Sequence, residues 1–327
     1  MEKTQYSRII RRIRIIIRYD GIAVALLLLP FRLIKYFVIN KLRWLYVRRV
    51  SFGNIYSSNE YKSPLACTSQ LCNQDFFGLP LFCYWMSCLK IKPVLHRKNW
   101  EWAYIIQSLW ENGFLKEGSR GLCFGVGKEQ LPALFAAMGC EITATDLGIN
   151  SGESKAWQKG NQHIGKDVQL LNHSQICPDD VFIKNVHFRN VDMNAIPADL
   201  RNFDFNWSSC ALEHIGGMQK SLDFIINQLD TLRSGGLAVH TTEFNLTSNN
   251  RTANDPGGCV LRKRDILGIV EELEKLGHYV YPLDLRRGCL AGDSYVDLPP
   301  YQSHPVHLRL LVSAYAATSI GLIIRKK

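Results

Sequence analysis

The chain has 327 residues, and its 46% hydrophobic content is that of an ordinary globular protein, which excludes a disordered or fibrous chain. This length favours one large domain with an additional segment over three domains. The formal net charge of +10 is spread unevenly, because residues 1–50 hold 12 Lys/Arg and 2 Asp/Glu whereas the remaining residues hold 27 of each. The positive excess therefore belongs to the N-terminal segment.

Residues 8–49 interleave Arg and Lys with Ile, Leu, Phe, Tyr and Trp. The longest uncharged run, Gly21–Phe31, has 11 residues, whereas a membrane-spanning helix needs about 20. No small-residue cleavage site of a signal peptide follows it, and Pro30 divides the segment into two helices. The pattern favours an amphipathic arm on an anionic membrane surface. An arm packed on the body and a nucleic-acid-binding arm are the alternatives, and the leucine run argues against nucleic acid.

Residues 51–100 predict a linker followed by an accessory segment, and residues 51–64 are the polar part. Four cysteines then form two C-x4-C pairs, a spacing that does not suit zinc ribbons or fingers. We expect reduced thiols, with a four-cysteine cluster as the alternative. These cysteines are Cys67, Cys72, Cys83 and Cys88.

The stretch Gly121–Asp146 predicts a strand, a glycine turn, a helix and a second strand. Its first strand is an apolar run of the kind that a buried parallel strand needs. Gly125 and Gly127 allow a tight turn and close approach of a ligand. Asp146 stands 19 residues after Gly127, at the carboxyl end of the second strand, where open α/β sheets bind ligands and an acid accepts hydrogen bonds from ribose hydroxyls.

A dinucleotide-binding turn carries the pattern G-x-G-x-x-G. Here Gln130 stands at the third glycine position, and Lys128 and Glu129 occupy the tip of the turn. A dehydrogenase is therefore an alternative that the missing glycine disfavours, and a merely structural glycine turn is another.

Strands and helices continue to alternate along the chain, which predicts an α/β protein. A long polar insertion, residues 147–185, separates the second and third strands. The expected strands are 122–126, 141–145, 186–192, 203–209, 237–244, 279–285 and 318–325, and the expected helices are 104–114, 130–138, 154–162, 222–232 and 263–276.

From about Trp110 onward the chain resembles the class I S-adenosylmethionine-dependent methyltransferases. The segments that carry the resemblance are FGVG, ITATD, RNVDM, FDFNWSSCALEHIGG and LRSGGLAVHTTEFN, in the family's order. The resemblance implies a Rossmann-like, doubly wound sheet of about seven strands with an antiparallel last strand, and S-adenosyl-L-methionine as the cofactor. With an N-terminal helical extension, the expected organisation is an arm (1–50), an accessory segment (51–100) and a methyltransferase domain (101–327).

The resemblance also implies which residues hold the cofactor. The backbone of the glycine turn meets the methionine part, Asp146 the ribose, and Asp192 and Met193 the adenine. The family usually carries an acid where this chain has Cys123, so another group must meet the ammonium group. The expected cofactor-binding residues are Phe124, Gly125, Val126, Gly127, Asp146, Asp192, Met193, Ser208 and Ser209.

His214 is the best candidate for a general base, because the reference pKa of histidine lies near the operating pH. Many family members carry a structural histidine in a similar L-E-H segment, which is the alternative. Glu243 is the second catalytic candidate, and Glu213 and Asn245 are expected to contact the acceptor. Related quinone-pathway enzymes bind a divalent metal through two glutamates and this histidine. The first of those glutamates falls at Cys210 here, so we expect no metal.

Residues 288–310 are rich in Asp, Pro, Tyr and His, which predicts an acceptor pocket or, alternatively, a surface hairpin. Asp293, Tyr301 and His307 are the acceptor-binding candidates. With the basic arm, this predicts O-methylation of a sugar hydroxyl in a lipid-linked or cell-surface glycan at the cytoplasmic membrane face, with glycosyltransferases as partners and no nucleic acid. A prenylated phenol or quinone as acceptor, and a non-catalytic partner of a glycosyltransferase, are the alternatives.

Overall fold

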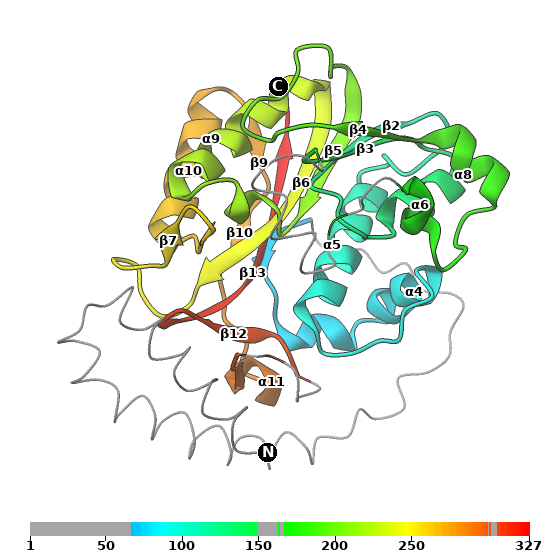
Figure 1. The fold of residues 1–327 in the computed structure, drawn as a ribbon. Coiled ribbons are helices and arrows are strands. Elements are labelled where there is room, and N and C mark those ends of the chain that lie inside the picture. The colour runs from blue at the N-terminus through cyan, green and yellow to red at the C-terminus, as the bar shows by residue number, and fades with distance from the viewer. Residues whose placement is uncertain (1–66, 149–162, 164–166, 300, 302–305) are drawn as a thin grey trace.

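The computed structural model describes residues 67–148, 163, 167–299, 301 and 306–327. Within them, eleven strands form one sheet, and two short strands form a separate pair (Figure 1). The predicted arm at 1–50 and the predicted helix at 154–162 lie outside the described residues.

The main path of the sheet is β10-β1-β13-β6-β5-β2-β3-β4, with β9 and β12 paired to β13, and β11 paired to β12. The strands are β1 (Ser69–Leu71), β2 (Arg120–Phe124), β3 (Glu141–Asp146), β4 (Val186–Asn190), β5 (Phe203–Ser209), β6 (Leu232–Asn245), β7 (Asn254–Asp255), β8 (Gly258–Cys259), β9 (Tyr279–Val280), β10 (Leu283–Asp284), β11 (Val296–Asp297), β12 (Arg309–Val312) and β13 (Tyr315–Arg325).

Helices cover both faces of the sheet, with α9 and α10 on one side and α4, α5, α6 and α8 on the other (Figure 1). The α-helices are α4 (Pro80–Cys88), α5 (Arg97–Glu111), α6 (Leu131–Ala137), α8 (Asp179–Asn185), α9 (Met218–Asn227), α10 (Lys263–Lys275) and α11 (Ala291–Ser294). Short 3-10 turns are η2 (Gln74–Gly78), η3 (Val168–Asn172), η4 (Leu212–His214) and η5 (Gln228–Thr231).

The two-residue period of the strands supplies a core to each helical layer. In β2, Leu122 and Phe124 belong to the cluster with α9 and α10, whereas Cys123 between them belongs to the cluster with α5 and α6. Because both faces of each central strand are buried, these strands appear in the sequence as nearly continuous apolar runs.

The predicted fold class is confirmed. Strands β4, β3, β2, β5 and β6 are parallel neighbours, and β13 runs antiparallel to β6 over nine residue pairs. The sheet is larger than the expected seven strands, because short strands such as β1 and β12 extend it. The single strand predicted at 279–285 is divided into β9 and β10 on either side of Pro282, a residue that cannot donate to a strand ladder.

Residues 67–100 belong to the same body as the rest of the described chain. β1 pairs with β13 and β10, and α4 packs against α5 in the core cluster. The boundary predicted at residue 100 falls inside α5.

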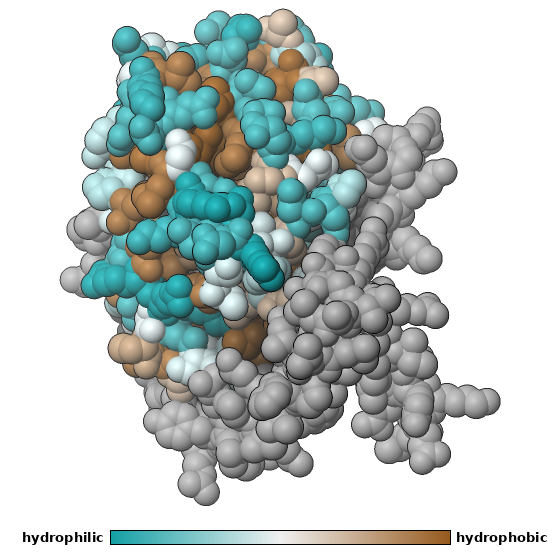
Figure 2. Space-filling model, turned by 90° about the vertical axis from the view of Figure 1, so that its left-hand side faces the viewer, coloured by the Kyte–Doolittle hydropathy of each residue, from teal (hydrophilic) through white to brown (hydrophobic). Residues whose placement is uncertain are grey.

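The α9 and α10 side of the molecule carries apolar residues between polar ones (Figure 2). Leu267, Leu276 and Tyr279 are exposed there. Within the described ranges, no helix is long and apolar enough to cross a membrane.

Candidate functional site

The turn between β2 and α6 is built on two glycines. Gly125 and Gly127 have φ values of +62° and +52°, in the left-handed region that residues with a Cβ rarely adopt. A Cβ on Gly125 would lie 2.6 Å from the Cβ of Ala211, so this position has no room for a side chain. The Gly127 N–H donates to Asp146 Oδ2 over 2.9 Å, which joins the turn to the end of β3.

A cavity of about 420 Å³ opens above this turn. It lies at the carboxyl ends of four parallel strands, since residues at or just after the ends of β2, β3, β4 and β5 line it. The lining residues include Arg97, Lys98, Trp102, Gly125, Val126, Gly127, Lys128, Glu129, Asp146, His163, Asp192, Met193, Ser209, Cys210, Ala211, His214 and Ile215.

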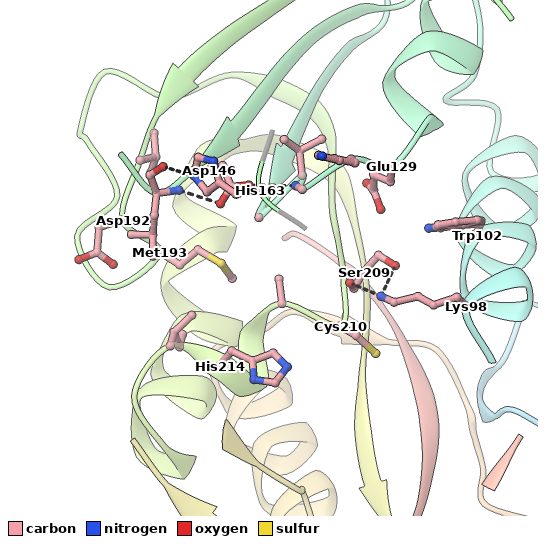
Figure 3. A pocket seen from close by; sticks show the side chains of 18 of the residues that line it. Lys98, Trp102, Glu129, Asp146, His163, Asp192, Met193, Ser209, Cys210 and His214 are labelled. Atoms are coloured by element: carbon pink, nitrogen blue, oxygen red, sulfur yellow. Dashed lines mark hydrogen bonds between the residues drawn. The ribbon is translucent and has the colours of Figure 1, made fainter. Parts of the chain in front are cut away.

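Most of the predicted cofactor residues meet at this cavity. Asp146, Asp192 and Met193 lie on one side of it, and Ser209 lies on the other (Figure 3). Gly125, Val126 and Gly127 also line it. The sequence therefore identifies the residues on the adenosine side of the predicted site, and their binding roles stay predictions.

Two predicted cofactor residues have their side chains in the core, although the contact expected of Phe124 was through its backbone. Phe124 is fully buried and packs edge-on against Phe224 of α9, with 5.1 Å between the ring centroids. The Ser208 hydroxyl lies 2.8 Å from Nδ1 of His240 in the core. Burial lowers the pKa of His240 to about 3, so this imidazole stays neutral. Alternation along β5 explains the difference, because only one of two successive serines faces the cavity.

His214 lines the cavity from the η4 turn (Figure 3). Its Nδ1 lies 3.1 Å from the carbonyl oxygen of Gly257. This contact favours the tautomer that carries its proton on Nδ1, which makes Nε2 the basic nitrogen.

Glu213, predicted to contact the acceptor, and Glu243, the second catalytic candidate, do not line the cavity. Glu213 is fully buried, and the Thr242 hydroxyl donates to it over 3.1 Å. Burial raises the pKa of Glu213. Glu243 forms an ion pair with Arg97, with 2.8 Å between Nη2 and Oε1. These side chains thus support the floor beneath the cavity.

The other predicted acceptor-binding residues also lie outside the cavity. Each of them binds a partner within the fold. Asn245 donates to the Arg251 carbonyl over 3.0 Å. Asp293 pairs with Arg309 over 3.0 Å. The other two are held in the same way: the Tyr301 hydroxyl donates to the Leu311 carbonyl, and His307 Nδ1 lies 2.6 Å from Asp297 Oδ2. Where it is described, the 288–310 segment forms α11, β11 and the start of β12.

Sequence reasoning missed the residues that α5 brings to the cavity. This helix begins at Arg97, ahead of the predicted start at Tyr104, and its first turns contribute Arg97, Lys98 and Trp102. The available signal was the basic pair before Glu101, which allows ion pairs at i,i+4 and i,i+3. Glu129, His163 and Cys210 were also missed as lining residues.

Glu101 anchors a buried charge cluster under the cavity. Its side chain is fully buried, with Arg97 Nη1 at 3.2 Å and Lys98 Nζ at 2.9 Å. The hydroxyls of Ser209 and Ser319 and the thiol of Cys210 also donate to it. Burial acts to raise the pKa of Glu101, but Lys98 and Arg97 outweigh it and hold the pKa at about 2.

No group of three or more His, Cys, Asp and Glu side chains in the described part of the chain is arranged to hold a metal ion. All ten cysteines are free thiols, including the four of the two C-x4-C pairs.

No protein-family model matches the sequence, and no curated protein matches it. Among solved structures, the chain is similar to the CurJ carbon methyltransferase (TM-score 0.38, 13% identity), with 70% of this chain and 54% of that chain covered. It is similar to phosphoethanolamine N-methyltransferase 2 of Haemonchus contortus (TM-score 0.39, 16% identity), with 62% and 42% covered. It is also similar to the [4+2]-cyclase SpnF (TM-score 0.41, 18% identity), with 68% and 79% covered. The chain spans about half the length of the first two proteins. Proteins of different activities stand at this same low similarity, so the case for a function rests on the cavity.

Proposed function

We propose that the chain is an S-adenosylmethionine-dependent methyltransferase. The observation that supports this most is the cavity at the carboxyl ends of four parallel strands, bounded by the Gly125–Gly127 turn and by Asp146. Its volume of about 420 Å³ is within the range of roughly 300–1,000 Å³ for small-molecule sites. Open α/β sheets bind nucleotide-like ligands at this edge.

The side of the cavity around Asp146 suits an adenosine group. Asp146 accepts one backbone N–H at each oxygen, from Gly127 and from Leu147. Because a carboxylate has about four acceptor positions, both oxygens keep capacity for the two ribose hydroxyls. Met193 and Ile215 supply apolar surface for the adenine ring, and Asp192 supplies an acceptor for its amino group.

The opposite side suits an amino-acid group, which carries a carboxylate and an ammonium. The indole nitrogen of Trp102 is buried and has no partner at full hydrogen-bond geometry within the described residues, although it acts on the nearby Glu129 carboxyl. Lys98 Nζ lies at the same side of the cavity (Figure 3). A carboxylate would satisfy the orphan N–H and complement the cation. The residues present therefore fit S-adenosylmethionine.

When bound, S-adenosylmethionine supplies an activated methyl group. The chain itself has to bind and orient the acceptor and remove the acceptor's proton. His214 is our candidate for the last task, with Nε2 as the basic nitrogen. The buried ion pairs of Glu101 and Glu243 fix Arg97 and Lys98 at the floor of the cavity. A base at the position of His214 suits an acceptor that loses a proton when it is methylated, such as a hydroxyl group.

For the acceptor, we propose a sugar hydroxyl of a lipid-linked or cell-surface glycan. The basic, leucine-rich sequence of residues 8–49 supports this, because it favours docking to an anionic lipid surface at the inner face of the membrane, where glycosyltransferases are candidate partners. A prenylated phenol or quinone fits the same arm and is the alternative acceptor. The loop that contains Asp293 gives no support to either choice, since its side chains bind one another.

We expect purified protein to bind S-adenosylmethionine with micromolar affinity in a calorimetric titration, and an Asp146→Ala variant to bind it more weakly by about 1–3 kcal/mol. The loss follows from ribose hydroxyls that no longer find an acceptor in a buried site. It corresponds to an affinity roughly 5- to 150-fold lower.

Asp223→Ala on the exposed side of α9 is the matched control and should bind as the wild type does. Binding of a nicotinamide dinucleotide in place of S-adenosylmethionine would overturn the proposal in favour of a dehydrogenase.

We expect the protein to transfer the labelled methyl group of S-adenosylmethionine to a lipid extract, and a His214→Ala variant to do so about a hundredfold more slowly. Cofactor binding should be unchanged in the variant, because the substitution removes a proton acceptor and leaves the adenosine contacts intact. Mild acid hydrolysis of the product separates a labelled sugar from a labelled phenol. Cofactor binding without transfer to any extract would instead favour a non-catalytic partner of a glycosyltransferase.

A further inference from the structure

Glu129 is a buried acid in the wall of the cavity. It follows the Gly125–Gly127 turn, and its residue surface is only 7% exposed. Its side chain lies across the cavity from Asp192 and on the same side as Trp102 (Figure 3). The turn therefore supplies a carboxyl group at the end of the cavity that suits an amino-acid group.

The hydrogen bonds of Glu129 leave one of its oxygens to the cavity. Oε1 accepts from the indole nitrogen of Trp207 over 2.7 Å and from the thiol of Cys123 over 3.3 Å. Neither donor carries a charge, and no ion pair to Glu129 is found in the described part of the chain. Both of these bonds end on Oε1, and the carboxyl group lines the cavity, with the indole N–H of Trp102 as a further neighbour.

The groups that face Glu129 do not balance its charge. Lys98 of α5 acts on it from the same side of the cavity and is itself paired with Glu101. Cys123 of β2 is a neutral thiol, since burial raises its pKa well above the ordinary value, and Asp146 of β3 adds a further negative charge near it. Trp102 of α5 and Trp207 of β5 contribute uncharged indole N–H groups. Lys128, the preceding residue, lines the cavity as well.

Burial accordingly raises the pKa of Glu129 to about 7, although Trp207, Lys98, Cys123 and Trp102 act in the opposite direction. A buried carboxyl without a cationic partner favours its neutral form. A cation that arrives beside it supplies the missing partner and favours ionisation.

We propose that Glu129 binds the ammonium group of the cofactor's amino-acid part, and that it releases its proton when this cation binds. The inference rests on the proposed function, because it takes S-adenosylmethionine as the ligand. The step moves one proton from the carboxyl group to solvent, leaves a carboxylate beside the ammonium, and forms or breaks no other bond. Glu129 thus couples cofactor binding to pH.

The sign of this coupling follows from the two protonation states. The carboxyl is neutral in the free protein below pH 7 and ionised in the complex, so affinity rises with pH up to about 7 and is lost as the pH falls below it. The number of protons released on binding is about one at pH 6 and about zero at pH 9.

The test uses the whole protein with S-adenosylhomocysteine, 5′-methylthioadenosine and an S-adenosylhomocysteine analogue without the α-amino group. Glutamine at position 129 keeps an oxygen for Trp207 and Cys123, so the wall of the cavity is retained. We expect Glu129→Gln to bind S-adenosylhomocysteine about 10- to 100-fold more weakly. It should bind the other two ligands as the wild type does, because neither carries the ammonium group.

Calorimetry in two buffers of different ionisation enthalpy counts the released protons at pH 6, and the variant should release none. Glu274→Gln, on the exposed side of α10, is the matched control and should behave as the wild type. Equal affinity of wild type and Glu129→Gln for S-adenosylhomocysteine would overturn this inference and leave the proposed function standing. If neither S-adenosylhomocysteine nor 5′-methylthioadenosine binds the wild type, the proposed function itself is overturned, and the inference with it.

Discussion

Replacing Glu101 with glutamine is expected to lower the free energy of unfolding by about 3–5 kcal/mol, which is the cost of removing one partner from a buried ion pair. Glu101 is fully buried and holds two cations, Arg97 and Lys98. Glutamine keeps the size of the side chain and removes its charge. Lys98 then loses its only ion pair among the described residues.

Urea unfolding at pH 7 measures this effect as a lower midpoint with an unchanged slope. Glu243→Gln is the matched control, because Glu243 makes one contact with Arg97, which keeps Glu101. We expect that control to lose less than about 2 kcal/mol. A Glu101→Gln variant as stable as the Glu243→Gln variant would show that the cluster does not depend on Glu101.

The pH dependence of stability is a second test of the role of Glu101. The pKa of Glu101 is lowered from 4.5 to about 2 in the folded protein. The contribution of the ionised Glu101 to the free energy of unfolding is therefore fully present above pH 4.5 and is lost as the pH falls toward 2. The Glu101→Gln variant should lack this part of the acid-unfolding curve.

Replacing Arg309 with leucine is expected to destabilise the protein by a similar amount, about 3–5 kcal/mol. Arg309 is 1% exposed, and its guanidinium binds five partners. Leucine would leave the Asp293 carboxylate buried without its cation. The remaining partners that would lose a donor are the carbonyl groups of Cys72 and Arg287 and the side chains of Asn73 and Thr318.

Thermal and urea unfolding report this loss. Arg286→Leu is the control from the same region, since Arg286 pairs with Asp284 on the surface and an exposed pair contributes at most about 1 kcal/mol. An Arg309→Leu variant with wild-type stability would mean that Asp293 does not need its cation, and would return Asp293 to the candidates for ligand binding.

Much of the fold is predictable because buried parallel strands have a simple sequence pattern. The predicted strand at 203–209 coincides with β5 residue for residue, and Asp146 closes β3 as expected. Tight turns also leave a clear signal, since Gly125 and Gly127 both adopt positive φ.

The start of α5 has only a weak sequence signal, the basic pair before Glu101, because buried polar residues break the helix's amphipathic pattern. Asn99, Glu101 and Gln107 are all buried on this helix. Each has a hydrogen-bond partner outside the helix: Asn99 donates to the Lys92 carbonyl, and Gln107 accepts from the indole of Trp85. Glu101 accepts from Ser319, which lies 218 residues away in the sequence.

The predicted acceptor pocket at residues 288–310 was not found in the described part of that segment, for a related reason. Asp, His and Tyr in a loop indicate either ligand contacts or contacts with one another, and composition does not distinguish the two. Here Asp297 binds His307 and Asp293 binds Arg309, so the polar groups are satisfied within the fold. Glu129 is the opposite case, a residue that lines the cavity without a sequence signal. The sequence of a turn does not specify on which side of the backbone an acidic side chain is buried.

The position of β13 has a consequence for how the protein folds. β1 is the first strand of the described chain, and its partner β13 is the last, with Gln70 opposite Gly321. Contacts between residues this distant in the sequence have a high loop-closure cost and slow folding. Ser319 of β13 also completes the shell of Glu101 beneath the cavity. During synthesis the shell of Glu101 is therefore complete only after β13 leaves the ribosome, and until then β6 presents an open edge to which other chains can add.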